Sequence, residues 1–220
     1  MTYKICVSVP VNENESIDQL LERISQKKPD FVEFRLDRVS NTQTIEHIAK
    51  KKSCLSIATD RSNRDQGTKE KLLLGAATAG FDFVDVDILS PSAETTIQRV
   101  KSLGSRVILS FHDNTKTPSP NELKKILRTQ IKAKSDLCKV VTTAVQSHDN
   151  LTILQFLEEE SVETKLVSFA MGPQGVPSRI LSPLFGAEFT IASFDDTSKT
   201  AEGQLTIDNL RNVWQLLGVQ

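Results

Sequence analysis

The sequence predicts an α/β protein that folds as a (β/α)8 barrel. Eight short β-rich runs alternate with helix-like stretches along the chain, as parallel strands joined by helices do. No GxGxxG motif follows the first run, so the pattern favours a closed barrel over an open, doubly wound sheet. The 220 residues lie near the lower end of the length range of such barrels, and no linker or low-complexity segment interrupts them. We therefore expect residues 1–220 to form a single domain.

The expected strands are short runs of apolar and β-branched residues. They cover residues 3–11, 31–37, 53–59, 81–89, 106–112, 137–144, 165–171 and 188–194. Six helices are expected where apolar residues recur at three- and four-residue spacing, often after a Ser, Thr or Asp that caps the first turn. These helices cover residues 16–26, 68–80, 92–104, 119–134, 149–160 and 206–218.

Composition and charge exclude several classes of protein. The 27 basic and 28 acidic residues nearly cancel, and no run of like charge could follow a phosphate backbone, so nucleic acid is not an expected partner. The chain starts without the pattern of a signal peptide, and no apolar run is long enough to span a membrane. We expect a soluble cytoplasmic protein.

Cysteine and histidine spacing gives no support to a metal site. The three cysteines, Cys6, Cys54 and Cys138, lie far apart inside apolar runs, which is typical of buried free thiols. The three histidines form no HxH or HExxH pair. We expect no metal site.

Strand alternation predicts that charged side chains point into the barrel, because successive residues of a strand face opposite sides. In the run 31–37, Glu33, Arg35 and Asp37 share the face opposite to the apolar one. The same alternation places Asp85 and Asp87, then Ser110 and His112, on inward faces of later strands. Glu33 and Arg35 alone could be a structural ion pair, but charges on several strands of one barrel indicate a binding site.

Lys139 lies in this polar interior, in the apolar run 137–144. Burial disfavours the ammonium form, so a buried lysine is expected to have a lowered pKa and to attack carbonyl groups as a neutral amine. Two other interpretations stay open: the side chain extends to the rim, or it pairs with Glu33 or an inward aspartate for structural reasons. His112 favours chemistry, because it ends its strand at the carboxyl end of the barrel, where barrel active sites lie.

Six sequence blocks together resemble type I 3-dehydroquinate dehydratase, a carbon–oxygen lyase of the shikimate pathway, which leads to chorismate and the aromatic amino acids. They are EFRLD (33–37), DRSNRDQG (60–67), SFHD (110–113), LCKVV (137–141), MGPQGVPSR (171–179) and TAEGQ (200–204). The resemblance covers nearly the whole chain, in the family's order. It implies a catalytic (β/α)8 barrel that removes water from 3-dehydroquinate by syn elimination through a lysine Schiff base.

The resemblance also implies a role for each matching residue. Lys139 would form the imine, and His112 would donate and accept the proton. The residues implied to bind the substrate are Ser8, Glu33, Arg35, Arg61, Arg179, Thr200 and Gln204, with Arg179 at the carboxylate. No cofactor is implied, and the family is commonly a homodimer.

Three positions depart from the family's usual pattern. Asp65 stands where the family has a glutamate thought to orient the histidine, so the side chain that bears this carboxylate is shorter here. Thr200 stands where many members have serine, and Glu202 where many have proline. These departures leave the implied reaction intact but change side chains that the resemblance implies to orient the histidine or to lie in the segment 195–204.

Two alternatives to a dehydratase follow from the same residues. A class I aldolase also uses an imine lysine in such a barrel, and the MGPQG turn could hold a phosphate. Against this, Pro173 removes one backbone donor. A binding barrel without catalysis is the other alternative, and it leaves the Lys139 and His112 combination without a purpose.

Overall fold

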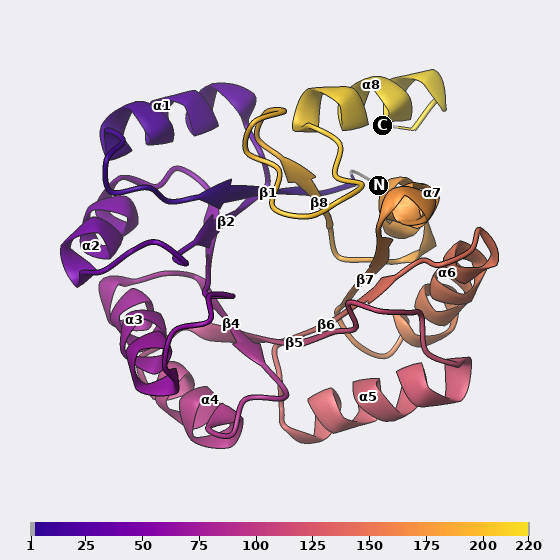
Figure 1. Cartoon of the computed structure of the whole chain (residues 1–220), viewed down its shortest axis with the longest axis horizontal. Coiled ribbons are helices and arrows are strands. Elements are labelled where there is room, and N and C mark those ends of the chain that lie inside the picture. The colour runs from indigo at the N-terminus through magenta and orange to yellow at the C-terminus, as the bar shows by residue number, and fades with distance from the viewer. Residues whose placement is uncertain (1–2, 220) are drawn as a thin grey trace.

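The computed structural model describes residues 3–219 as eight parallel strands that form a barrel inside a ring of helices (Figure 1). The fold predicted from the sequence is confirmed. The strands are β1 (Ile5–Pro10), β2 (Phe31–Arg35), β3 (Leu55–Thr59), β4 (Phe83–Asp87), β5 (Arg106–His112), β6 (Leu137–Thr143), β7 (Leu166–Met171) and β8 (Thr190–Ser193).

Eight α-helices and two short 3₁₀ helices follow the strands. They are α1 (Ile17–Lys27), α2 (Thr42–Lys51), α3 (Gln66–Ala79), α4 (Ala93–Ser102), α5 (Pro120–Lys132), α6 (His148–Glu160), η1 (Pro173–Gly175), α7 (Val176–Leu181), η2 (Ser182–Phe185) and α8 (Ile207–Leu216). Six of the eight α-helices were expected; α2 and α7 were not. Helix α7 has only six residues, too few for a periodic pattern.

Helix α2 left a weak signal in the sequence. Its buried apolar residues are Ile45 and Ile48, three positions apart, which is a short pattern for a ten-residue helix. The Asn41 side chain caps it by accepting a hydrogen bond from the Thr44 backbone N–H at 3.2 Å. An asparagine cap, one apolar pair and two lysines in the last turn were the signs of this helix.

Hydrogen bonding joins the strands in the order β7-β6-β5-β4-β3-β2-β1-β8. Among the described residues, β7 and β8 form no ladder, so the barrel has a seam there. One backbone hydrogen bond crosses this seam near the amino ends of the two strands, where Glu188 N donates to Leu166 O at 2.8 Å. The barrel is therefore nearly closed.

The two faces of the strands bury different residues, as alternation predicts. Val32 and Phe34 are fully buried against the helices, in the largest hydrophobic cluster. Inside the barrel, a second apolar cluster lies at the level of Cys6, Phe31 and Phe83. Two residues further along β2 and β4, the inward residues are Glu33 and Asp85. Inside the barrel, a polar layer therefore lies next to an apolar layer, on the side of the carboxyl end.

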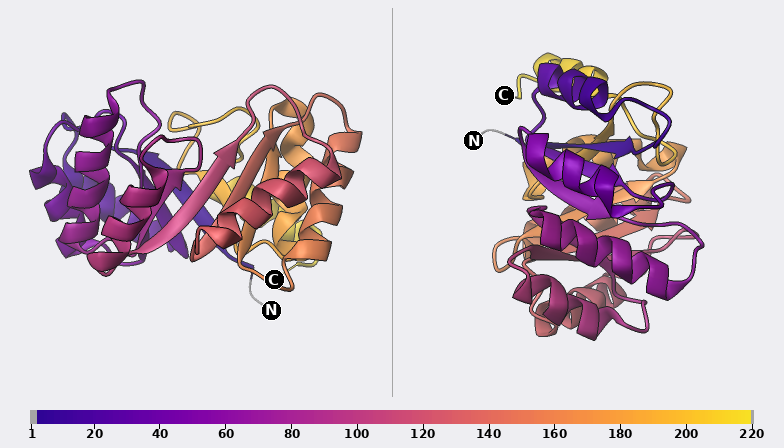
Figure 2. Two further views of the ribbon diagram at one scale, coloured as in Figure 1. Left: turned by 90° about the horizontal axis from the view of Figure 1, so that it is seen from below. Right: turned by 90° about the vertical axis from the view of Figure 1, so that its left-hand side faces the viewer.

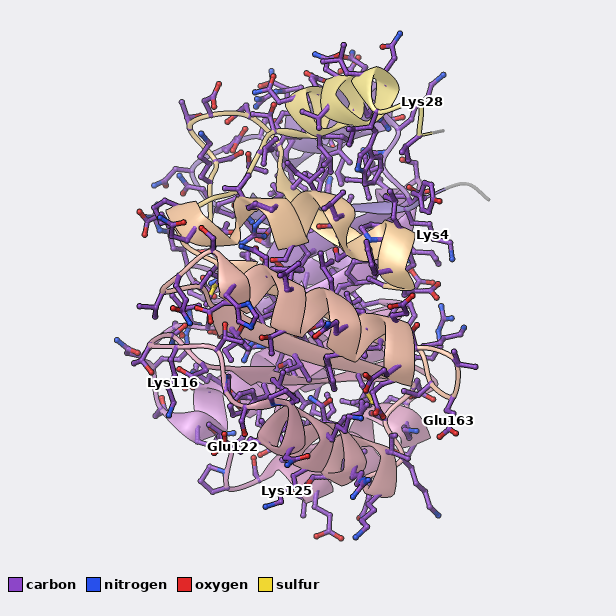
Figure 3. The ribbon with its side chains drawn as sticks, turned by 90° about the vertical axis from the view of Figure 1, so that its right-hand side faces the viewer. Lys4, Lys28, Lys116, Glu122, Lys125 and Glu163 are labelled. Atoms are coloured by element: carbon purple, nitrogen blue, oxygen red, sulfur yellow. The ribbon has the colours of Figure 1, made fainter. Side chains whose placement is uncertain are left out.

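Loops that follow the strands lie along one edge of the molecule, which is the carboxyl end of the barrel (Figure 2). In the side view of Figure 3, Lys116, after β5, lies at this end, whereas Lys4 and Glu163, before β1 and β7, lie at the other. No helix within residues 3–219 is long and apolar enough to cross a membrane. Cys6 and Cys138 are buried free thiols, as expected, and Cys54 is partly exposed.

Candidate active site

A cavity of about 430 Å³ opens at the carboxyl end of the barrel. Eight of the residues implied by the sequence line it: Glu33, Arg35, Arg61, His112, Lys139, Arg179, Thr200 and Gln204. Ser8 is fully buried in the wall behind them. A second cavity of about 470 Å³ lies beside the first and shares Arg35 and Thr200, but it contains neither Lys139 nor His112. The first cavity therefore holds the candidate chemistry.

Lys139 is buried on β6 between two carboxylates. Its Nζ donates to Asp85 Oδ2 at 3.0 Å and to Glu33 Oε1 at 3.1 Å. Burial alone would lower the pKa of Lys139, but the charges of Asp85 and Glu33 outweigh it, and the pKa is raised. The expectation of a neutral amine was wrong, because it considered burial without these partners. The pairing with Glu33 and an inward aspartate, left open from the sequence, is present.

The two carboxylates are held by further donors. Glu33 Oε2 accepts from Ser8 Oγ at 2.7 Å, and its Oε1 accepts from Thr59 Oγ1 at 3.1 Å. Burial would raise the pKa of Glu33, but the charges of Lys139 and Arg35 lower it to about 2. Glu33 is therefore ionised at neutral pH.

Asp85 on β4 is also an anion at neutral pH. Its Oδ1 accepts from Arg61 Nη2 at 2.5 Å and from Ser110 Oγ at 2.6 Å. Burial opposes ionisation, but Arg61 and Lys139 hold the pKa of this carboxyl well below its usual range. Arg61 also donates to Asp87 Oδ2 at 3.0 Å. Arg61 thus binds the acidic residues of β4.

His112, at the end of β5, is a neutral imidazole at neutral pH. Burial lowers its pKa, as do the positive charges of Arg61 and Lys139, to about 3. Its Nδ1 is buried and has no hydrogen-bond partner among the described residues. A neutral histidine that lines the cavity beside Lys139 can accept a proton from a bound molecule and return it.

Arg179, at the end of α7, offers an unpaired cation to the cavity. One nitrogen, Nη1, donates to Ile191 O at 3.2 Å, whereas the buried Nε and Nη2 have no partner within residues 3–219. The guanidinium carbon lies 4.3 Å from the centre of the Phe169 ring. Burial lowers the pKa of Arg179 to about 10, which leaves the group charged at neutral pH. Two free donors on a buried cation suit a carboxylate.

The segment 195–204 covers one side of the cavity and is anchored in this structure. Gln204 is buried, and its Oε1 accepts from Thr200 N at 2.8 Å. Thr200 Oγ1 donates to Ser8 Oγ at 3.0 Å. Gly203 has a φ of 78°, and a Cβ there would lie 2.5 Å from Gly172 O, so no larger residue fits. The segment therefore contacts both β1 and the turn after β7.

Asp65 lies away from His112. Its side chain is exposed, and its Oδ1 accepts from Thr68 N at 2.9 Å, which caps α3. The role implied by the resemblance, orienting the histidine, has no contact to support it here. The short side chain is held at the helix start, outside the cavity lining.

Three polar residues of the site were not assigned a role from the sequence: Thr59, Asp85 and Ser110. Asp85 and Ser110 face inward by alternation, so the signal was present. Their bonds to Arg61, to each other and to the Val86 carbonyl were not predicted, because each joins residues at least 24 positions apart.

Comparison with known proteins fits these observations. The model of the family described as type I 3-dehydroquinase matches residues 5–220. The chain belongs to the type I 3-dehydroquinase family. The 3-dehydroquinate dehydratase of Dehalococcoides mccartyi is 34% identical over 209 residues, covering 90% of this chain and 92% of the relative. That of Pyrococcus abyssi is 31% identical over 211 residues, covering 93% and 95%.

Solved structures of 3-dehydroquinate dehydratases share the fold. The crystal structure of 3-dehydroquinate dehydratase from Geobacillus kaustophilus has a TM-score of 0.88 at 23% identity, covering 99% of this chain and 92% of that one. The protein from Aquifex aeolicus has a TM-score of 0.81 at 22% identity, with 98% of each chain covered. At this level of identity the likeness concerns the barrel alone.

We expect the neutral state of His112 to make stability depend on pH. The folded pKa of about 3 lies below the value of about 6.5 in an unfolded chain. The unfolded chain alone takes up a proton between these values, so this stability is present above pH 6.5 and lost as pH falls towards 3. At pH 5 the loss reaches about 2 kcal/mol, and His112→Asn should remove it.

Urea unfolding at pH 7.5 and pH 5 measures this loss. His148→Asn is the matched control, because this histidine is exposed at the start of α6. The control should lose as much stability at pH 5 as the unaltered protein. An equal loss in His112→Asn would contradict a neutral, buried His112.

Proposed function

We propose that the chain is a 3-dehydroquinate dehydratase and converts 3-dehydroquinate to 3-dehydroshikimate by syn elimination of water. The observation that carries the proposal is a buried Lys139 in a cavity that also contains neutral His112 and Arg179, which has no carboxylate partner among the described residues. Relatives that share 30% identity or more over most of the chain are named 3-dehydroquinate dehydratase. On this proposal residues 1–220 form one catalytic domain.

Charge in the buried cluster supports a substrate with one carboxylate. Lys139 is paired with Glu33 and Asp85, and Arg61 is paired with Asp85 and with the partly exposed Asp87, so both of these cations already have carboxylate partners. Arg179 is then a buried cation that no carboxylate within residues 3–219 pairs with. A substrate carboxylate would neutralise it through the free Nε and Nη2.

The first chemical step would form the imine at Lys139. The ammonium passes two protons, one after the other, to the oxygen of the substrate ketone as nitrogen bonds to carbon. The oxygen leaves as water, and a protonated imine remains, so positive charge is conserved. This iminium withdraws electrons from the neighbouring carbon.

His112 would then carry out the elimination. The neutral imidazole accepts the proton from C2, and the electron pair moves into the iminium to give an enamine. The imidazolium returns the proton to the C1 hydroxyl, which leaves as water on the same face of the ring while the enamine electrons reform the iminium. Hydrolysis of the iminium then releases the product and restores Lys139.

The remaining residues would hold the substrate. Arg179 would bind the carboxylate, and Glu33 and Arg35 would bind ring hydroxyls. Arg61, Ser8, Thr200 and Gln204 would complete the site, since Ser8 connects Glu33 to Thr200 through two hydrogen bonds. No metal or other cofactor enters any of these steps.

Lys139→Met tests the imine, because methionine is similar in length but cannot form one. We expect loss of dehydratase activity, measured as formation of the conjugated product, while circular dichroism keeps the barrel signal. Borohydride with dehydroquinate should add the substrate mass to Lys139 of the unaltered protein. Turnover by the variant, or a label on another lysine, would refute the assignment. A label with phosphorylated aldehydes alone would favour an aldolase, and no label with either would favour a binding barrel.

His112→Ala should separate imine formation from proton transfer. A positioned acid–base group supplies roughly 10²- to 10⁴-fold in rate, so we expect turnover to fall by that factor. The trapped adduct at Lys139 should still form and should accumulate during slow turnover, as measured by mass spectrometry. An unchanged rate would exclude His112 from the mechanism.

We further propose that the protein is a cytoplasmic homodimer. Exposed apolar side chains support an interface near α6, where Leu151 is 54% exposed and the preceding Val145 is 66% exposed. Sedimentation equilibrium should give twice the chain mass of 24.4 kDa. Leu151→Lys should shift the mass towards that of one chain, whereas an unshifted dimer would place the interface elsewhere.

A further inference from the structure

Asp85 lies behind Lys139 and outside the cavity. It is 3% exposed and is not part of the cavity lining, whereas Glu33 and Lys139 are. Arg61 and Ser110 both bind its Oδ1. Its Oδ2 is left for one donor, Lys139 Nζ at 3.0 Å. A substrate that fills the cavity therefore meets Lys139 without displacing this carboxylate.

We infer that Asp85 is the counter-ion of the protonated imine: it stays beside the nitrogen of Lys139 through the reaction and keeps that nitrogen charged. This inference rests on the proposed imine chemistry. It gives Asp85 contact with a reacting atom, and it makes Arg61 and Ser110 positioning residues that hold Asp85.

The charge on the Lys139 nitrogen during the reaction explains why a counter-ion is needed. The nitrogen carries one positive charge as an ammonium and again as an iminium, so its partner must be an anion in both states. A neutral imine withdraws electrons poorly, and the proton on nitrogen is what drives removal of the C2 proton. An adjacent fixed carboxylate favours the protonated form.

Glu33 is less suited to this role. Its Oε1, which binds Lys139, also accepts from Thr59, and its Oε2 accepts from Ser8. Glu33 lines the cavity, so a bound ring competes for its oxygens. Asp85 has one oxygen for Lys139 alone and two donors that fix the other. Glu33 is thus available to the substrate, whereas Asp85 is kept for Lys139.

Other groups also act on the charge of this nitrogen. The titratable groups coupled to it electrostatically are Cys6 from β1, Glu33 from β2, Arg61 after β3, Asp85 from β4 and His112 from β5. Arg61 disfavours the charged nitrogen, and it is the group that Asp85 and Asp87 neutralise. Without the Asp85 charge, the charge of Arg61 is less compensated, and it disfavours the charged Lys139 nitrogen more strongly.

Asp85→Asn keeps the shape of the side chain and removes the charge. We expect the pKa of the imine to fall, so the alkaline limb of the kcat profile should move down by about one pH unit or more. Above that limb kcat should fall about tenfold for each unit. Lowering the pH should restore the rate, and borohydride at lower pH should still label Lys139. Counting trapped adduct corrects kcat for any unfolded fraction.

Asp87→Asn is the matched control. It removes a carboxylate from the same strand that also binds Arg61, but Asp87 does not contact Lys139. We expect its alkaline limb to stay where the unaltered protein has it, whatever its effect on the rate. Should Asp85→Asn not fold, Asp85→Ser removes the same charge from a smaller side chain and carries the same expectation.

Two results would overturn the inference. An unshifted alkaline limb in the Asp85 variants would show that Asp85 is not the counter-ion, and an equal shift in Asp87→Asn would show a general field effect. Failure of the proposed function is a separate outcome, because then the unaltered protein gives no adduct at Lys139 with dehydroquinate and borohydride.

Discussion

The ammonium of Lys139 between two buried carboxylates is the interaction on which the barrel interior depends. A buried charge without a partner is costly, and here each of four charges has one. Removing Lys139 would leave Glu33 without an ion-pair partner, and removing either carboxylate would leave Lys139 with one partner instead of two. The same arrangement sets the protonation states that chemistry needs, since the positive charges of Lys139 and Arg61 help to keep His112 neutral. Stability and reactivity therefore rest on one set of contacts.

The seam of the barrel explains where the remaining cation lies. Strands β7 and β8 form no ladder within residues 3–219, which leaves Ile191 O available to Arg179 Nη1 at 3.2 Å. Thr190 Oγ1 donates to Arg179 O at 2.7 Å, so β8 holds this residue by its backbone as well. A guanidinium fixed at one nitrogen and free at two others is preorganised for an anion. The gap in the sheet thus becomes the position of the group that we propose to bind the substrate carboxylate.

The sequence predicted the features that follow from local pattern, such as the direction of side chains along a strand. It did not predict features that depend on contacts between residues far apart in the chain. Alternation on β2, β4 and β5 correctly placed Glu33, Asp85 and Ser110 inside the barrel, because a period of two follows from strand geometry alone. The charge state of Lys139 was not predictable in this way, since it depends on carboxylates from β2 and β4 at about hydrogen-bond distance. Asp65 shows the same limit, because capping α3 occupies a carboxylate that the family resemblance placed beside the histidine.

Inside the barrel, a polar layer lies nearer the carboxyl end and an apolar layer nearer the amino end. This order determines how protons and water reach the site. Below the polar layer, Phe31 packs against Phe189 with ring centres 4.7 Å apart and against Phe83 at 6.1 Å, so an apolar floor separates Lys139 from the other end of the barrel. Exchange with solvent must pass through the carboxyl end. There, a chain of hydrogen bonds runs from Thr200 through Ser8 to Glu33, which binds Lys139. The segment that covers the cavity is therefore linked to the charge beneath it, and a movement of Thr200 would alter the hydrogen bonding of a carboxylate that holds the nitrogen of Lys139.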